Sequence, residues 1–592
     1  MAEKIDPTWL AYSFDQSVDD DRLDAGVARL EAHYGGLVSY PLATLRRTGE
    51  RRGIVVLTDS EPLCSWPHFA AARPIALGSA YVPPGWERLT GPLPAGEAGV
   101  PLARAVLADP ARAVAELRSP MVLGALDETA DRLVVVNDSI GAGRLFETRL
   151  AAGAVWSNRA AAGNLFAGIP VEADERGWQL LAAVGWFFGD STPIKGVSKV
   201  AAGSVIDAGP AGIEARETGI VGRLVSGDAG DLDRLYADAA EHAVDQVRFA
   251  DSLWHEKPAI HLSGGRDSRL VAAAAVNGEV DAVFRTSDNT PGEADIARQL
   301  VDVAPRPMDH VIAHGAEGEG PTSPLLERAL RGQLLHDGIR HASKVRRDVN
   351  LPRSRPNRAT LAGWGGEIAH AFYYQDKRQL RKVRRRGRDR VLTRLLEASR
   401  KKHDAAPEAS YERARSEYES VIAKGESHGL EGPDLLDWFY LVERFVHRFE
   451  IGADSQGVSV FATPAFIRLA FAITAEERLA VRAHSELTAR LVPEWSEVPF
   501  FKRQPGPRPQ LRRRRLWEAE EDAQTIEGLI AARGAWTELF REQRITEMWA
   551  ELRSGGGFAD WETVFERLAF RAAFGGFQAS VARSLTAAPL FR

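Results

Sequence analysis

The stretch AIHLSGGRDSRLV, residues 259–271, decides how the second half of the chain is expected to fold. Residues 259–262 are a short apolar run, which is typical of a buried strand in a parallel sheet. Residues 269–276, RLVAAAAV, have the composition and length of a helix start. The sequence therefore predicts a strand, a turn over SGGRDS and a helix.

The residue types in this turn point to an anion site. Gly264 and Gly265 let the backbone approach a ligand closely, and free N–H groups at a helix start attract negative charge. Ser263 and Ser268 add hydroxyl donors. The carboxylate of Asp267 would repel a phosphate unless a cation lay between them, so we interpret it as a Mg²⁺ ligand beside a polyphosphate. The alternative is a capped Gly-Gly turn without any ligand.

Composition excludes several classes of protein. The chain has 592 residues, of which 44% are apolar and 26% charged, with a net charge of −6, so no global field indicates a nucleic-acid or membrane partner. Its one cysteine, Cys64, excludes a disulfide framework and a cysteine-based zinc cluster. The sequence shows neither a signal peptide nor an apolar run of roughly 20 residues. We therefore expect a soluble cytoplasmic protein.

Two halves differ in pattern, and together they predict an α/β fold. Residues 1–225 contain short strands between Gly and Pro turns, such as RGIVVLTD from Arg52 and RLVVVND from Arg132. Residues 226–592 alternate strands with longer helical segments, such as LDRLYADAAEHAVDQVRFA from Leu232. This alternation favours a mostly parallel sheet covered by helices.

The turn SGGRDS resembles the SGGxDS signature of PP-loop ATP pyrophosphatases and lacks the spacing of a Walker A loop. VVNDSIGAGRLFETR from Val135 and VWSNRAAAGNLF from Val155 resemble the class II glutamine amidotransferase domain of asparagine synthetases. AVFRTSDNTPGEADIARQL from Ala282 resembles the next strand and helix of their synthetase domain. The chain is thus similar to the asparagine synthetase-like superfamily. This resemblance implies an amidotransferase-like (Ntn-type) α/β/β/α sandwich, then a PP-loop synthetase domain that binds ATP through Leu262, Ser263, Gly264, Gly265, Asp267, Ser268, Thr286 and Gly363.

One departure from that family concerns the glutaminase reaction. The family's glutaminase uses an N-terminal cysteine, whose thiolate and α-amine act as nucleophile and base. This chain begins Met1-Ala2-Glu3, and Cys64 lies in the interior of the sequence. The first half is therefore expected to be unable to release ammonia from glutamine, and the activated carboxyl must meet another amine.

The segment GWGGEI, residues 363–368, resembles the GYGSDI-type loop of β-lactam synthetases. The resemblance implies that Glu367 is the partner carboxylate of Asp267 across the metal. Trp364 falls where those enzymes have a catalytic tyrosine, and its indole cannot act as a base. The alternative for Glu367 is a solvated acid at a helix start.

Two further catalytic candidates come from the same resemblance. LVERFVHRFEIGADSQG from Leu441 is similar to the helix that carries a catalytic glutamate in β-lactam synthetases, which implies that Glu443 takes a proton from the attacking amine. VPFFKRQPG from Val498 is similar to a late lysine segment, so Lys502 is expected to stabilise developing negative charge. An ion pair of Glu443 with a neighbouring arginine and a solvated Lys502 are the alternatives.

A basic tract over residues 377–402 has thirteen Lys and Arg residues against Asp389 and Glu397. Such tracts can bind nucleic-acid phosphates. Aromatic residues do not interleave with this one, so a solvated basic helix face is the preferred interpretation.

Within the superfamily, SGGRDSR and GWGGEIAHAFYY together with an inactive amidotransferase domain most resemble lasso peptide cyclases. The resemblance implies that ATP and Mg²⁺ serve to adenylate an Asp or Glu side chain of a precursor peptide. The N-terminal amine freed by leader removal then closes a macrolactam. A leader peptidase and a leader-binding protein are the implied partners. The alternative is another amide ligase of the superfamily, either an ammonia-dependent asparagine synthetase or an enzyme that closes a small β-lactam-like molecule.

Overall fold

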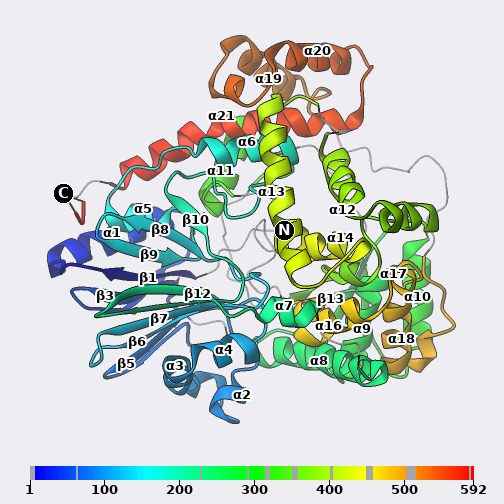
Figure 1. Ribbon diagram of the computed structural model, residues 1–592, viewed down its shortest axis with the longest axis horizontal. Coiled ribbons are helices and arrows are strands. Elements are labelled where there is room, and N and C mark those ends of the chain that lie inside the picture. The colour runs from blue at the N-terminus through cyan, green and yellow to red at the C-terminus, as the bar shows by residue number, and fades with distance from the viewer. Residues whose placement is uncertain are drawn as a thin grey trace.

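The computed structural model describes residues 7–61, 64–226, 230–288, 290, 292–313, 321–339, 342–349, 358–400, 404–447, 458–501, 515–585 and 589–591, without the side chains of 343, 344, 399, 400 and 559. Within these residues the chain forms two antiparallel sheets, one parallel sheet and a large helical part (Figure 1). It is therefore a mixed α/β fold, as the sequence predicts.

The first half contains two six-stranded sheets. The first has the order β10 (Val197–Lys199), β8 (Phe146–Leu150), β9 (Gly153–Ser157), β1 (Thr8–Phe14), β3 (Arg52–Asp59), β2 (Leu42–Thr48). The second has the order β12 (Gly212–Glu217), β11 (Ser204–Gly209), β7 (Arg132–Asn137), β6 (Val122–Asp127), β5 (Ile75–Ser79), β4 (Phe69–Ala72). Every pair of neighbouring strands in both sheets is antiparallel. The strands predicted from Arg52 and Arg132 are confirmed as β3 and β7.

These sheets pack face to face, with helices on both outer faces (Figure 1). Trp9 and Ile54 of the first sheet and Val135 of the second belong to the apolar layer between them. The outer face of the first sheet packs against α1 (Asp20–Gly35) and α5 (Ala162–Ala167). The outer face of the second packs against α3 (Gly99–Ala108) and α4 (Pro110–Glu116). The layer order is therefore helix, sheet, sheet, helix.

The second half contains a four-stranded sheet of order β15 (Asp309–Ala313), β14 (Val283–Ser287), β13 (Ala259–His261), β16 (Thr360–Leu361). All of its strand pairs are parallel, as the alternation of strands and helices predicts. α8 (Leu232–Leu253) confirms the helix predicted from Leu232 and contacts α9 (Arg266–Asn277), while α10 (Glu293–Asp302) contacts β14. The strand β13 of this sheet ends at the turn that leads into α9.

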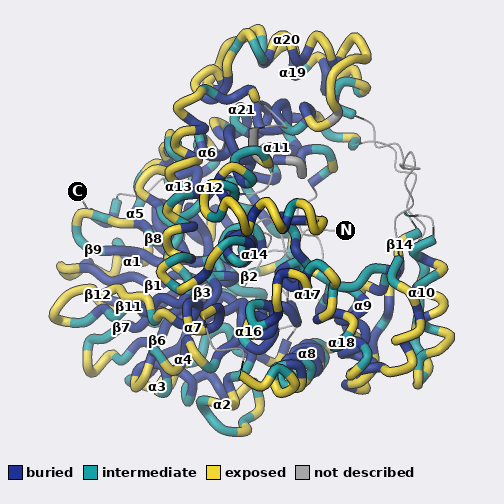
Figure 2. The backbone as a smooth tube through the Cα atoms, turned by 45° about the vertical axis from the view of Figure 1, so that its right-hand side comes forward, coloured by how far each residue is buried: buried dark blue, intermediate teal, exposed yellow. Residues whose placement is uncertain are grey.

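The last helix, α21 (Glu562–Arg583), joins the end of the chain to its first half. Arg567 Nη1 donates a hydrogen bond of 2.9 Å to the Ala182 carbonyl, and Phe574 packs edge to face on Trp178. α7 (Ile220–Val225) ends at the residue where the sequence predicts that the first half ends. The division of the chain into two domains at this residue remains a prediction. Figure 2 shows the buried interior of the sheets and the exposed residues on outer helices such as α20.

The remaining helices belong mainly to the helical part and are α2 (Glu87–Thr90), α6 (Glu175–Val184), α11 (Leu325–His336), α12 (Lys377–Arg400), α13 (Glu408–Ser427), α14 (Pro433–Phe439), α16 (Pro464–Ala472), α17 (Ala475–Leu479), α18 (Arg482–Leu491), α19 (Glu520–Ala532) and α20 (Glu542–Arg553). A π-helix, η4 (Tyr440–Phe445), follows α14, and the 3₁₀ turns are η1 (Ala95–Glu97), η2 (Ala342–Arg346), η3 (Gly366–Ala369), η5 (Val460–Ala462), η6 (Pro493–Trp495), η7 (Ala535–Glu538) and η8 (Ala559–Trp561). Among the helices of the described residues, none combines the length and the apolar character needed to cross a membrane.

Candidate active site

The predicted anion loop lies between β13 and α9. The hydroxyls of Ser263 and Ser268 are 2.7 Å apart, and the Gly265 N–H donates to Ser263 Oγ over 3.1 Å. The helix begins at Arg266, three residues earlier than the sequence predicts, because Gly265 is extended and Asp267 is accommodated in the first turn. The first-turn N–H groups of α9 therefore lie beside the two serines, which is an arrangement suited to a phosphate.

Asp267 is enclosed by two histidines from distant segments. Its Oδ1 lies 2.8 Å from His484 Nε2 and 3.4 Å from His370 Nε2, but neither ring forms a well-aligned hydrogen bond with it. Burial acts to raise the pKa of Asp267, and the two nearby imidazoles outweigh it and hold that pKa well below its usual range. Burial lowers the pKa of His484, although Asp267 opposes that shift. Asp267 is therefore an ionised carboxylate with an oxygen available to a cation.

The segment from Gly363 to Glu367 packs directly on this loop. A Cβ on Gly363 would lie 2.5 Å from the Ser268 nitrogen, and one on Gly366 would lie 2.2 Å from Asp267 Oδ1. Glycine is therefore required at both positions for the two loops to approach. The structure thus brings together the predicted residues of SGGRDS and GWGGEI, although their contact with ATP is still a prediction.

Glu367 is partly buried at the start of η3 and is held by two donors. Its Oε2 accepts a hydrogen bond of 2.7 Å from the Tyr440 hydroxyl and one of 3.1 Å from the Gly365 N–H. Trp364 is 39% exposed, and its carbonyl accepts a hydrogen bond from Ser459. Glu367 is thus a fixed carboxylate beside the loop, whereas a merely solvated acid would have neither partner.

Two other predicted ATP contacts, Leu262 and Thr286, are buried at the ends of their strands. The Thr286 hydroxyl donates to the Leu262 carbonyl over 2.7 Å and lies 2.8 Å from His310 Nε2. In this structure the hydroxyl ties together the ends of β13 and β14, so Thr286 positions the loop that follows Leu262.

Arg269 is a buried residue that the sequence analysis missed. It donates to the Val498 carbonyl at 2.6 Å and to the Pro499 carbonyl at 2.8 Å, and it lies 4.4 Å from the ring centre of Phe500. Burial lowers its pKa to about 10, which leaves the guanidinium charged at neutral pH. Arg269 therefore fastens this segment to the anion loop. Lys502, which follows the segment in sequence, lies outside the described residues.

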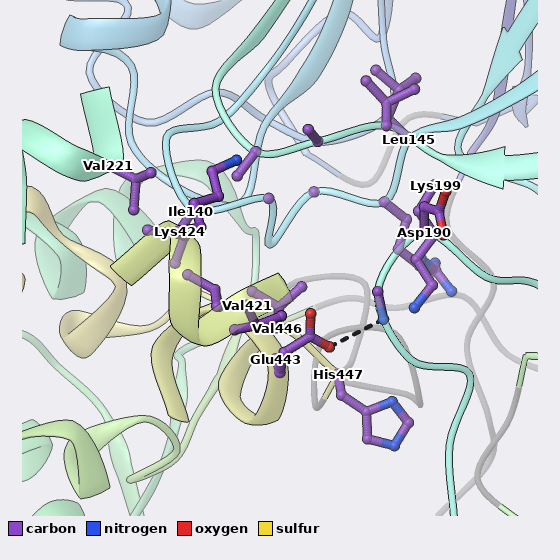
Figure 3. A pocket seen from close by; sticks show the side chains of 18 of the residues that line it. Ile140, Leu145, Asp190, Lys199, Val221, Val421, Lys424, Glu443, Val446 and His447 are labelled. Carbon is purple, nitrogen blue, oxygen red and sulfur yellow. Dashed lines mark hydrogen bonds between the residues drawn. The ribbon is translucent and has the colours of Figure 1, made fainter. Parts of the chain in front are cut away.

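Glu443 is on the π-helix η4, three residues after Tyr440. Its Oε2 accepts a hydrogen bond of 3.3 Å from the Gly189 N–H in the first half of the chain (Figure 3). The side chain lines a cavity of about 250 Å³ between the two halves. Tyr440, whose hydroxyl bonds Glu367, lies three residues before Glu443 on the same π-helix.

The donors at Asp267 and Glu367 suit Mg²⁺ rather than a nitrogen- or sulfur-bound metal. Across the described parts of the chain, no cluster of three or more His, Cys, Asp or Glu side chains is arranged to hold a metal ion. Mg²⁺ needs fewer protein ligands, since it typically binds one or two carboxylates and completes its shell with phosphate oxygens and water. The buried Asp267 Oδ1 without an aligned hydrogen bond fits this requirement.

The described part of the basic tract forms α12, which is kinked at Gly387, where φ is 51°. Several of its arginines form ion pairs with glutamates of α12, α13 and α17, namely Arg388–Glu426, Arg390–Glu397 and Arg384–Glu476. These pairs reduce the charge available to a nucleic acid, in line with the preferred interpretation of a solvated helix face.

No protein-family model matches the sequence, and a search of curated proteins finds no match. Two similar solved structures are glutamine phosphoribosylpyrophosphate amidotransferase from B. subtilis complexed with ADP and GMP, and an allosteric regulatory enzyme of purine biosynthesis. The first has 9% identity and a TM-score of 0.24, covering 62% of this chain and 83% of the other. The second has 9% identity and a TM-score of 0.23, covering 66% and 78%. Likenesses this weak carry no argument about this chain.

Proposed function

We propose that this chain is an ATP-dependent amide ligase that adenylates a carboxyl group and joins it to an amine. The observation that carries the proposal is the loop Ser263–Ser268 at the start of α9, with the ionised Asp267 packed against Gly363 and Gly366. A helix start with two serines suits a polyphosphate, and an acid within it suits a cation between the charges.

The family assignment belongs to the same proposal. We assign residues 1–225 to an amidotransferase-like (Ntn-type) sandwich and residues 226–592 to a PP-loop synthetase domain. The order of layers in the first half and the parallel sheet before α9 support this assignment. Both assignments depend on the sequence resemblance described above.

Asp267 and Glu367 are the residues that would hold Mg²⁺, and the Tyr440 hydroxyl keeps Glu367 in place. When bound, Mg²⁺ neutralises phosphate charge next to these carboxylates. The first-turn N–H groups of α9 and the hydroxyls of Ser263 and Ser268 bind and orient the phosphates of the substrate ATP.

The reaction has two steps. A substrate carboxylate oxygen attacks the α-phosphorus of ATP, and pyrophosphate leaves to give an acyl-adenylate. An amine nitrogen then attacks the acyl carbon, the bond from that carbon to the AMP oxygen breaks, and AMP leaves. We assign Glu443 as the acceptor of the amine proton and Lys502 as a cation that stabilises the developing negative charge.

The substrate that fits the sequence resemblance is a lasso precursor peptide. In this assignment an Asp or Glu side chain is adenylated, and the N-terminal amine of the leaderless peptide closes the macrolactam. A leader peptidase and a leader-binding protein would supply that peptide. Holding the amine next to the adenylate can contribute roughly 7–11 kcal/mol of the barrier in well-oriented cases.

Pyrophosphate release from ATP and Mg²⁺ in the presence of linear core peptides tests the proposal. Release that requires a peptide, is lost in Asp267→Ala and yields a product lighter by one water would support peptide cyclisation. Asp19→Ala is a matched control, since Asp19 caps the surface helix α1 through the Arg22 N–H. Release with ammonia and free aspartate would indicate asparagine synthesis instead, and no release with any substrate would contradict the ligase proposal.

A further inference from the structure

The first part of α12 presents a row of exposed cations that the rest of the protein does not use. The members of this row, called here the α12 patch, are Lys377, Arg378, Arg381, Lys382, Arg385 and Arg386. Because they are three and four residues apart along the helix, they lie on one face of it. Leu380 and Val383 are each 2% exposed and pack the opposite face against the protein. The α12 patch is therefore a fixed, outward-facing surface.

The positive charge of the α12 patch is not balanced within the described parts of the chain. The nearby acids Glu476 and Glu426 are paired with Arg384 and Arg388, which are not members of the patch. No member of the patch has an ion pair with a carboxylate among the described residues. Like charges four residues apart on a helix repel and lower its stability. This cost is removed when an anionic partner covers the patch.

The length of the patch and the charge of the remaining chain favour a short acidic peptide over a nucleic acid. Residues 377–386 span about 15 Å of helix, which matches four or five extended peptide residues. The tract over residues 377–402 contributes +11 to a net charge of −6, so the rest of the chain carries −17. A long nucleic acid would extend past the patch over this acidic chain. Residues 377–386 also lack an aromatic ring on which a base could stack.

The α12 patch is within reach of a peptide bound at the candidate active site. Lys377 follows Glu367 by ten residues, so the two lie at most about 36 Å apart. The start of α12 is held in place by Tyr374, whose hydroxyl donates to Asp437 over 2.7 Å, and Asp437 pairs with Arg478 at 3.0 Å. A peptide with about ten extended residues between its reacting end and its acidic residues can therefore contact both places.

We propose that the α12 patch binds an acidic segment of the peptide substrate, outside the residues that react. The guanidinium groups of the patch donate paired N–H bonds to carboxylates, and the lysines add point charges. This inference rests on the proposed function, because that function makes the substrate a peptide. It adds a requirement that the reaction itself does not impose, namely acidic residues at a distance from the reacting amine and carboxyl.

Two peptides that differ only in their tails test this inference. The probe is a linear peptide that supports pyrophosphate release, extended at its C-terminus by a Gly-Ser linker and then by either glutamates or glutamines. At low salt the wild type should have a KM about 5- to 30-fold lower for the glutamate peptide, the worth of several exposed ion pairs, with the same kcat. The variant Lys382→Gln/Arg385→Gln/Arg386→Gln should reduce this preference to less than twofold. Screening by about 0.5 M salt should also reduce it.

The matched control is Arg104→Gln/Arg216→Gln/Arg234→Gln, which removes the same charge from exposed positions on α3, β12 and α8 and should keep the full preference. Equal KM values for the two peptides with the wild type, or a preference that persists in the patch variant, would overturn this inference alone. Tighter binding of a single-stranded oligonucleotide to the patch, measured by fluorescence anisotropy, would overturn it in favour of nucleic acid. Absence of pyrophosphate release with either peptide would overturn the proposed function, and this inference with it.

Discussion

Replacing Gly366 with alanine should disable the site and leave the protein folded. The added Cβ would lie 2.2 Å from Asp267 Oδ1 and 2.9 Å from His484 Nε2, where ordinary van der Waals contact is 3.4–4 Å. The Asp267 carboxylate must therefore move by about 1 Å, and a displacement of that size can cost about 100-fold in rate. Overpacking of this kind costs about 1–3 kcal/mol of stability, which is less than the typical 5–15 kcal/mol of a folded domain.

Pyrophosphate release and thermal unfolding of the Gly366→Ala variant are the two measurements. Gly528→Ala is the matched control, because a Cβ at this exposed position in α19 would meet no atom within 4 Å. It should keep full activity and gain about 0.5–1 kcal/mol of stability, since alanine is the better helix former. A folded Gly366→Ala protein with activity within threefold of the wild type would refute the assignment of Asp267 to the site.

Three other perturbations have outcomes that follow from single contacts. Arg269→Met leaves the carbonyls of Val498 and Pro499 without their buried donor. Urea unfolding should therefore show that the free energy of unfolding falls by about 2–5 kcal/mol. A fall below about 1 kcal/mol would contradict the role of Arg269. Tyr440→Phe removes a hydrogen bond that holds Glu367 in place. The Mg²⁺ concentration for half-maximal pyrophosphate release should therefore rise about 10- to 100-fold. An unchanged Mg²⁺ dependence would argue against Glu367 as a ligand. Burial lowers the pKa of His33 from 6.5 to about 4 in the folded protein. As the pH drops from 6.5 towards 4, the unfolded chain binds a proton at this histidine and the folded chain does not, so the free energy of unfolding falls. His33→Gln should lessen that loss by about 3 kcal/mol in urea titrations between pH 7 and pH 4, and parallel pH profiles of the two proteins would contradict it.

Local patterns in the sequence predicted the elements that carry the loop. The apolar run from Ala259 and the alanine-rich segment after Arg269 became β13 and α9, because strand and helix preferences act over a few neighbouring residues. Gly264 and Gly265 were identified as positions of close approach, whereas the tight contacts at Gly363 and Gly366 were not predicted. The start of α9 was predicted three residues too late, since an Asp-Ser pair fits the first turn of a helix as well as a turn before it.

The surroundings of the loop were decided by tertiary structure. His370 and His484 lie far along the chain from Asp267, and no spacing in the sequence predicts that they meet it. The same is true of Tyr440 on Glu367, although the phenol immediately precedes the segment quoted for Glu443. Periodicity identifies which face of a helix is buried, whereas the partner of a particular side chain depends on how distant elements pack.

The sequence by itself thus determined the strand, the turn and the helix at this place, because strand and helix preferences act over a few neighbouring residues. Only the tertiary structure decided which groups surround it and that a cavity lies between the two halves beside Glu443. The physical reason is the distance along the chain over which each kind of interaction acts. Backbone preferences are local, but the contacts of Trp186 with Arg444 and His447 join segments that only the packing of the two halves brings together.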